Sequence, residues 1–316
     1  MKRKVVFGID IGGTNIKSGI VDETGAILHA DNTPTDAQAG RDSLLDKLYE
    51  IARRYKERAA GEGWEACGMG VATAGYVHAR EGRIGYATSN LPGWTGVPLR
   101  DNMSRETGLP VALVNDAHAF AVGEAWIGAG KELEGFLCVT LGTGVGGSWV
   151  TKQGGTYFGR DGYAGGYGHI VIRHGGQACN CGLSGCWEQY ASVRALMRQA
   201  AEAGLDDSTT GGSAKRLFEL AREGHRTALD VIDQYAEYVA LGMTNLIHIL
   251  NPESIVVGGA ITAQGGFLFD RIRAQAERQM MPAYAPVRIV PAALGEQAGL
   301  AGAAKLAWSS TSPQGE

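Results

Sequence analysis

Three cysteines and a histidine form the most specific group of potential ligands in this sequence. Cys179, Cys181 and Cys186 lie within eight residues, and His169 precedes the first of them by ten. Three thiolates and one imidazole complete the tetrahedral shell that zinc prefers, and they leave no open position for water. We therefore expect a structural zinc site that ties residues 169–186 together. The alternative is a set of free thiols beside a core histidine.

Glu188 follows the last cysteine by two residues. A metal-bound loop would hold its carboxylate in a fixed position. Alternatively, Glu188 starts a helix, where a carboxylate interacts favourably with the helix dipole. The residues alone leave both interpretations open.

A glycine-rich turn with a preceding carboxylate follows the first predicted strand. Asp10 ends the strand, and Gly12, Gly13 and Thr14 follow it. Consecutive backbone N–H groups in such a turn can bind an anion, and Thr14 adds a hydroxyl donor. Asp10 can hold Mg²⁺ directly or through water, because Mg²⁺ binds one or two carboxylates together with phosphate oxygens. The alternative is a hairpin turn in which glycine only relieves backbone strain.

Two further glycine-rich turns follow predicted strands. Residues 142–147 read GTGVGG, which matches the dinucleotide fingerprint, but that fingerprint requires a helix and residues 148–151 are β-like. A Walker A loop is also excluded, because Lys131 is followed by Glu132. Gly258-Gly259 would let a flat group such as a nucleotide base pack against backbone, or would serve tight helix–strand packing. Three such turns together favour a phosphate or nucleotide cleft.

Asp116 is the candidate general base. With Asn115 it follows the strand at 111–114 and precedes a helix. The carboxyl end of a strand is where open α/β proteins place their chemistry. An aspartate there can accept the proton of an alcohol during phosphoryl transfer. The alternative is a helix N-cap.

The elements that must position these residues follow from hydrophobic periodicity and turn signals. Strands are predicted at 5–11, 67–73, 111–115 and 287–291, strand–glycine units at 136–147 and 254–261, a hairpin at 17–31, and helices at 42–58, 117–127, 229–250, 267–280 and 297–307. Alternating strands and helices indicate an α/β protein. Similar strand–glycine units in both halves predict two similarly built lobes that face a cleft.

Composition narrows the function classes. The 316 residues are enough for about two domains, and 29 basic against 33 acidic residues give a net charge of −4. This balance argues against nucleic acid as a main partner. The 48 glycines show no collagen-like period. Asp10 interrupts the N-terminal apolar run, so neither an export signal nor a membrane span is predicted and a cytoplasmic location is expected.

Several motifs together resemble one known family. The segments are DIGGTNIKSGIVDETG, NLPGW, VNDAHAFAVGE, LGTGVGG and GHIVIRHGGQACNCGLSGCWEQYAS. They resemble the ROK family of bacterial sugar kinases and related repressors, from about Val5 to Leu306. The resemblance implies a two-lobed, actin-like ATPase fold with a zinc-stapled loop, transfer of the ATP γ-phosphate to the 6-hydroxyl of a hexose with Mg²⁺, and a homodimer. The expected lobes are residues 1–115, completed by a helix at 297–308, and residues 116–296, with a loose tail at 309–316.

The resemblance also implies a role for each matching residue. Asp10, Gly12, Gly13 and Thr14 would form the first phosphate loop, Thr143 and Gly144 would belong to the second, and Gly258 and Gly259 would lie near adenosine. Asp116 would be the general base, while Asn90, Asn115, His169 and Glu188 would hold the other sugar hydroxyls. His169 would serve as both zinc ligand and sugar contact, because its two ring nitrogens allow it.

This sequence departs from the family pattern at two positions. The family reads Glu-x-Gly-His before the zinc ligand, whereas this chain has Gly166 at the glutamate position, and His118 stands where an asparagine is frequent. Glucose remains the expected acceptor. The volume freed at Gly166 makes an N-acetylhexosamine, N-acetylmannosamine above all or N-acetylglucosamine, the alternative. A sugar-sensing regulator is the alternative from another class, but its DNA-binding segment would precede a first strand that here begins at Val5.

Overall fold

The computed structural model describes residues 2–151, 155–284 and 286–311. The chain divides into two compact units. The first unit comprises Met1–Glu132, Ser148–Gly165 and Ala293–Glu316, and the second comprises Leu133–Gly147 and Gly166–Ala292. The lobe limits expected from the sequence, at residues 115 and 296, stay a prediction.

The first sheet positions Asp10 and Asp116. Its strand order is β3-β2-β1-β4-β7. The strands are β1 (Lys4–Ile11), β2 (Asn15–Asp22), β3 (Ile27–Pro34), β4 (Glu65–Thr73) and β7 (Val111–Asn115). The first three are antiparallel, while β1, β4 and β7 are parallel, with Asp10 beside Ala72 and Thr73 beside Asn115. The carboxyl ends of the three parallel strands therefore meet at one edge, where such sheets carry their chemistry.

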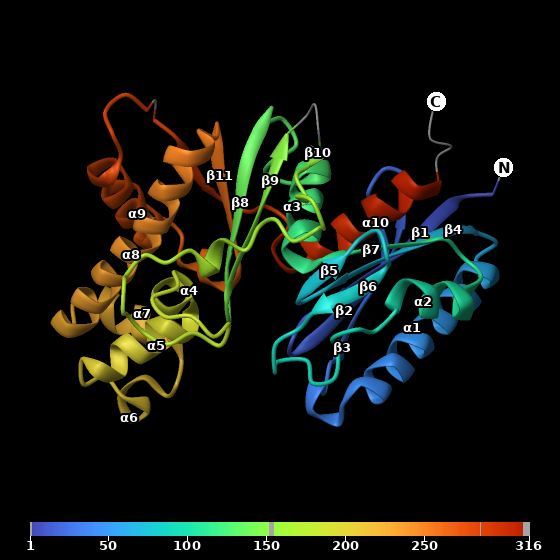
Figure 1. Ribbon diagram of the computed structural model, residues 1–316, viewed down its shortest axis with the longest axis horizontal. Helices are drawn as coiled ribbons and strands as arrows, with labels where there is room; N and C mark the ends of the chain where they lie inside the picture. Colours follow the sequence, from blue (N-terminus) through green and yellow to red (C-terminus); the bar gives the residue numbers. More distant parts are fainter. Residues whose placement is uncertain (1, 152–154, 285, 312–316) are drawn as a thin grey trace. The chain divides into compact units, whose positions relative to one another are not determined.

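Each face of this sheet has its own helix layer. Alternate side chains of β1 point to opposite faces, so Val5, Phe7 and Ile9 pack against α1 (Arg41–Gly61), near which α2 (Leu99–Thr107) lies. The other face contacts α10 (Ala298–Thr311), which packs along α3 (Asp116–Ile127) (Figure 1).

Small residues allow α10 to lie close to this sheet. A Cβ on Gly70 of β4 would overlap the Ala303 backbone, and a Cβ on Gly302 would overlap the Ala119 carbonyl oxygen of α3. The helix also runs to Thr311, so residues 309–311 of the expected loose tail are helical, and residues 312–316 lie outside the described residues.

The second sheet has the strand order β10-β9-β8-β11-β12. Its strands are β8 (Gly135–Leu141), β9 (Val145–Thr151), β10 (Gly155–Thr156), β11 (Ser254–Gly258) and β12 (Arg288–Pro291). Strand β11 is parallel to both β8 and β12. The helices of the second unit are α4 (Glu188–Ala191), α5 (Val193–Glu202), α6 (Asp207–Thr210), α7 (Ala214–Arg222), α8 (Arg226–Leu250) and α9 (Gly266–Gln279). The long helix α8 contacts α4, α5, α7 and α9.

The strands and helices predicted from the sequence are present, and the elements that were not predicted are short. Sequence analysis did not assign α2, α5, α7 or the hairpin of β5 (Tyr76–His78) and β6 (Arg83–Tyr86). The strand–glycine unit predicted at 254–261 consists of β11 and Gly259, and a 3₁₀ helix at Ala260–Gln264 follows. Further 3₁₀ helices span Ala37–Ala39, Tyr167–His169 and Gly295–Gln297. Among the described helices, none has the length and apolar character needed to cross a lipid bilayer.

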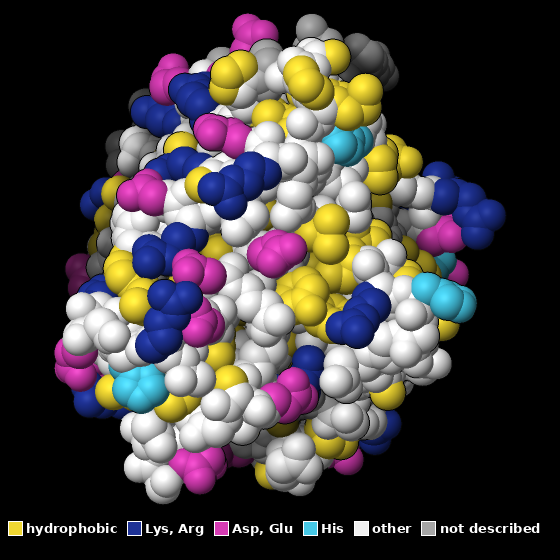
Figure 2. All heavy atoms as spheres, turned by 90° about the vertical axis from the view of Figure 1, so that its left-hand side faces the viewer, with side chains coloured by type: hydrophobic (Ala, Val, Ile, Leu, Met, Phe, Trp, Pro, Cys, Tyr) yellow, Lys and Arg dark blue, Asp and Glu magenta, His cyan; other side chains and the backbone are white. Residues whose placement is uncertain are grey.

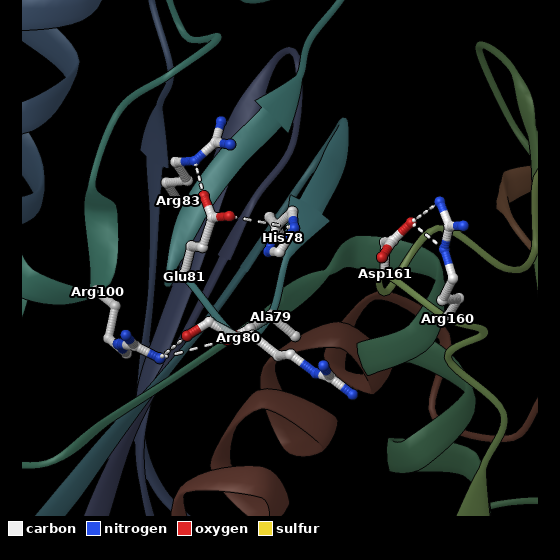
Figure 3. A network of polar contacts seen from close by, with 8 residues as sticks. All are labelled: His78, Ala79, Arg80, Glu81, Arg83, Arg100, Arg160 and Asp161. Atoms are coloured by element: carbon white, nitrogen blue, oxygen red, sulfur yellow. Dashed lines mark hydrogen bonds and ion pairs between the residues drawn. The ribbon is translucent and has the colours of Figure 1, made fainter.

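Polar contacts hold the β5–β6 hairpin (Figure 3). The Arg100 guanidinium donates to the carbonyl oxygens of Ala79 and Arg80, each at 3.3 Å, and Glu81 pairs with both Arg83 and His78. These groups are largely exposed, and such ion pairs contribute little to stability. We therefore assign them a local structural role.

Charges of both signs share the surface. Figure 2 shows lysine, arginine and acidic side chains interspersed across one face of the molecule. Many of the basic groups are paired, as Arg271 is with Asp233 at 2.7 Å and Arg216 with Glu223 at 2.9 Å. Such a mixed surface favours solubility rather than attraction of a polyanion.

Candidate active site and metal centre

Asp10 lies near the end of β1, on the face that contacts α10. Gly299, in the first turn of α10, has no side chain, and a Cβ there would lie 2.2 Å from Asp10 Oδ2. Burial and the nearby Asp116 carboxylate raise the pKa of Asp10 to about 7, and Lys17, directly opposite on β2, counteracts them. A bound cation would favour the ionised form, so the site suits a metal ion.

The first glycine turn joins β1 to β2. The Gly12 N–H donates to the Asn15 carbonyl oxygen at 3.0 Å, and the Thr35 hydroxyl donates to the Gly12 carbonyl oxygen at 2.7 Å. Gly13 is exposed, and a Cβ on it would meet nothing within 4 Å. The turn therefore closes a hairpin, as one interpretation predicted, and its exposed backbone remains accessible to an anion, as the other requires.

Asn115, rather than Asp116, is the N-cap of α3. Asn115 Oδ1 accepts from the N–H groups of Ala117 and His118, at 3.0 and 3.4 Å. Its Nδ2 donates to the Gly75 carbonyl oxygen and to Asp116 Oδ1, both at 2.8 Å. The capping interpretation of Asp116 is therefore wrong. All four hydrogen-bonding positions of the Asn115 amide are engaged, and one of them orients the candidate base.

The Asp116 carboxylate is held through one oxygen. Its Oδ1 accepts from Asn115 Nδ2 and from the Ala117 N–H, each at 2.8 Å. Burial raises the pKa of Asp116, although these hydrogen bonds oppose the shift. A half-buried carboxylate with a raised pKa, directly after a sheet strand, is a suitable proton acceptor.

Asn90 lies in the exposed loop between β6 and α2. Its N–H donates to the Thr88 hydroxyl at 3.4 Å. The loop is anchored four residues later by the fully buried Trp94, whose indole N–H donates to the Thr73 hydroxyl at 3.0 Å. Since Thr73 ends β4, the NLPGW segment is tied to the same sheet edge as Asn115.

His118 is a buried, neutral histidine. Its Nε2 donates to the Ala164 carbonyl oxygen at 2.8 Å, so Nδ1 accepts from the Ser148 hydroxyl at 2.7 Å. Burial lowers its pKa to about 4. His118 thereby anchors the segment just before Gly166, the other position at which this chain departs from the family pattern. At that position, Gly166 has φ −68° and ψ 42°, so its φ lies outside the left-handed region that favours glycine.

The second glycine turn joins β8 to β9, and no helix follows it. This confirms the rejection of the dinucleotide fingerprint. Gly142 donates to the Gly144 carbonyl oxygen at 3.0 Å and accepts from the Val193 N–H at 2.9 Å. Thr143 lies between Gly142 and Gly144 at the tip of the turn.

The third glycine turn packs directly beside the second. Gly258 ends β11, and Gly259 has φ +99°. A Cβ on Gly259 would overlap the Leu141 carbonyl oxygen, one residue before Gly142. Tight packing therefore explains Gly259, as one interpretation expected, and the same packing brings the two turns together.

The expected metal ligands converge. The ligand atoms of His169, Cys179, Cys181 and Cys186 all lie within 4.8 Å of one another. His169 Nδ1 is 3.7 Å from Cys179 Sγ, and the sulfur atoms of Cys181 and Cys186 are 3.6 Å apart. The sulfur–sulfur distance exceeds that of a disulfide bond, and both distances suit ligands around a shared tetrahedral ion. The donor set fits zinc, and it leaves His169 Nε2 for another partner.

Glu188 begins α4, but its carboxylate is directed to the second glycine turn. Glu188 Oε2 accepts from the Val145 N–H at 3.0 Å. A Cβ on Gly144 would lie 2.4 Å from the same oxygen. Sequence analysis missed this contact, because no local pattern relates residues 43 positions apart.

The chain is similar to known proteins over almost its whole length. The model of the ROK family matches residues 6–310. The chain belongs to the ROK family. It is 36% identical to a glucokinase of Thermotoga maritima over 97% of this chain and 98% of the relative.

Solved ROK structures agree with the fold. A ROK glucokinase of Streptomyces griseus, in complex with glucose and AMPPNP, has a TM-score of 0.82 and 34% identity, covering 96% of this chain and 99% of that one. A ROK hexokinase of Thermus thermophilus has a TM-score of 0.83 and 32% identity, covering 97% and 98%. The expected α/β fold of the actin-like ATPase type is thereby confirmed.

Proposed function

We propose that this protein is an ATP-dependent sugar kinase that transfers the γ-phosphate to the 6-hydroxyl of glucose. The observation that carries the proposal is the pair of half-buried carboxylates with raised pKa values, Asp10 near the carboxyl end of β1 and Asp116 directly after β7. The glucokinase relatives, similar over nearly their whole length, support glucose as the acceptor.

Asp116 acts as the general base. Its Oδ1 is occupied by the Asn115 amide and the Ala117 N–H, so Oδ2 receives the proton of the sugar hydroxyl. Asn115 positions the carboxylate and starts α3 in the same contact set. Most of the catalytic work in such transfers is positioning and charge stabilisation, and this arrangement supplies the positioning.

The phosphates are assigned to the glycine turns. Gly13 and Thr14 offer backbone N–H groups and Thr14 a hydroxyl, while Gly12 shapes the turn, because its own N–H donates to the Asn15 carbonyl oxygen. Thr143 and Gly144 offer backbone N–H groups and a hydroxyl from the second turn, and Gly258 and Gly259 flank adenosine. Asp10 holds Mg²⁺, which when bound neutralises phosphate charge. Zinc at His169 and the three cysteines braces residues 169–186.

The sugar hydroxyls are assigned to Asn90, Asn115, His169 and Glu188. His169 keeps Nε2 available because its Nδ1 faces the sulfur atoms. Gly166 removes one carboxylate acceptor, which favours a second candidate, an N-acetylhexosamine whose acetyl group would occupy the freed volume. We further propose a cytoplasmic homodimer. Light scattering of the purified protein tests the dimer.

The experiment measures ADP release with ATP and Mg²⁺ over a panel of sugars. The panel contains glucose, mannose, fructose, allose, N-acetylglucosamine and N-acetylmannosamine. We expect the highest kcat/KM with glucose, since specificity is a difference in transition-state binding. Turnover confined to an N-acetyl sugar would replace glucose as the acceptor. Silence on every sugar would refute the kinase proposal.

Variants test the roles of Asp116 and Gly166. Asp116→Ala should retain the fold and lose turnover, and kcat near that of the wild type would show that the base is assigned wrongly. Because its pKa is raised, the wild-type kcat/KM should decline on acidification at a pH above the ordinary aspartate value of 3.8. Gly166→Glu, at a position whose negative φ does not require glycine, should lower the glucose KM if the missing carboxylate matters.

A further inference from the structure

Glu188 is held by a rigid neighbour on its amino-terminal side. Trp187 is fully buried, its N–H donates to the Ile170 carbonyl oxygen and its indole N–H donates to the Tyr238 carbonyl oxygen, each at 2.8 Å. The indole ring lies so close to Gly242 of α8 that a Cβ there would overlap it. Since Trp187 directly follows the ligand Cys186, the metal-binding segment and α8 together determine where the Glu188 backbone lies.

The second glycine turn contacts residues on either side of the metal-binding segment in the sequence at three points. Glu188 Oε2 accepts from the Val145 N–H, and the Val193 N–H donates to the Gly142 carbonyl oxygen. Gly168, one residue before the ligand His169, lies against Val145, where a Cβ would overlap the Val145 carbonyl oxygen. Two of these contacts, from Glu188 and Gly168, come from residues within two positions of a metal ligand, and both meet Val145.

We infer that Glu188 is a positioning residue for the nucleotide as well as a sugar ligand. One carboxylate oxygen holds the second glycine turn in its binding conformation, and the other remains for the sugar. A glycine turn without this contact would have to be ordered when nucleotide binds, at a cost in affinity. This role rests on the proposed function, because it assumes that the turn binds phosphate.

The first test separates the two oxygens of Glu188. The dissociation constant of ADP with Mg²⁺ is measured by titration calorimetry without sugar, on the zinc-loaded protein. Glu188→Ala should weaken ADP binding about tenfold, because it removes a hydrogen bond to a charged group. Glu188→Gln keeps an oxygen for the Val145 N–H, so its ADP affinity should stay within about threefold, while its glucose KM rises. Equal ADP affinity in Glu188→Ala and the wild type would overturn the inference.

The second test perturbs the contact from the other side. A methyl group in Gly144→Ala would lie 2.4 Å from Glu188 Oε2, so it should displace the carboxylate and weaken ADP binding to a similar degree. In the double variant the methyl group has room, so its loss should not exceed that of Glu188→Ala. Additive losses would mean that Gly144 acts independently of Glu188, and they would overturn the inference.

Controls keep the test separate from folding and from the proposed function. Glu202→Ala removes a carboxylate that is 57% exposed and paired with Arg198 on α5, so ADP affinity should not change. Zinc content and melting temperature are measured for every variant. If Glu188→Ala fails to fold, the ADP affinities of Glu188→Gln and Gly144→Ala test the inference instead. ADP affinity in Gly144→Ala equal to that of the wild type would then overturn it. Failure of the proposed function would appear differently, as a wild-type protein that phosphorylates no sugar.

Discussion

Gly299→Ala tests whether the position of the Asp10 carboxylate controls catalysis. The substitution adds a methyl group at 2.2 Å from Asp10 Oδ2, whereas ordinary contacts begin at 3.4 Å. The carboxylate must therefore retreat by about 1 Å, and a misplacement of that size can cost on the order of 100-fold in rate. We expect kcat/KM to fall about 100-fold.

The same substitution should leave the fold intact. Gly299 is the second residue of α10, and the preference for alanine over glycine, about 1 kcal/mol in a helix interior, is at most that large in this first turn. This gain offsets part of the local repulsion, so the melting temperature should change by only a few degrees. Loss of activity without loss of stability is the expected signature of a displaced active-site group.

The assay is ADP release at saturating sugar, with Mg²⁺ and ATP varied separately. A matched control is Gly61→Ala at the end of α1, where a Cβ would meet nothing within 4 Å and activity should be unchanged. If Gly299→Ala retained wild-type kcat and the wild-type dependence on Mg²⁺, the assignment of Asp10 would be wrong.

Three further predictions concern stability. The pKa of His118 is about 4 in the folded protein and 6.5 in the unfolded chain, so the free energy of unfolding is about 3 kcal/mol higher above pH 6.5 than near pH 4 on account of this group. Urea unfolding from pH 4 to 7 should show the free energy of unfolding rising with pH in the wild type, and rising less in His118→Asn. Glu124 is fully buried, and its carboxylate accepts from the N–H groups of Ala129, Ala293 and Leu294. Glu124→Ala should therefore lower the free energy of unfolding by about 3 kcal/mol. A loss below about 1 kcal/mol would contradict a stabilising role of these hydrogen bonds. Chelation of the metal should lower both melting temperature and activity, and added Zn²⁺ should restore them; a metal-free protein with unchanged melting would refute the structural metal site.

Local patterns in the sequence were sufficient for the metal centre and the main strands. The four expected metal ligands lie within 18 residues, so only short-range geometry is needed to bring them together. Strands β1, β7 and β8 are largely apolar runs with glycines or polar residues at or directly after their carboxyl ends. Short helices such as α5 and α7 were missed because their signals are brief and their stability comes from packing against α8.

Only the tertiary structure decided how the site residues are held. The sequence offered Asp116 as either a base or the cap of α3, whereas in the structure Asn115 is the cap, with its amide oriented by the Gly75 carbonyl oxygen 40 residues away. The contacts of Asp10 with Gly299 and of Glu188 with Val145 join positions even farther apart in the chain. Periodicity and spacing describe neighbours along the chain, whereas these contacts arise from the packing of whole elements, which no local pattern encodes.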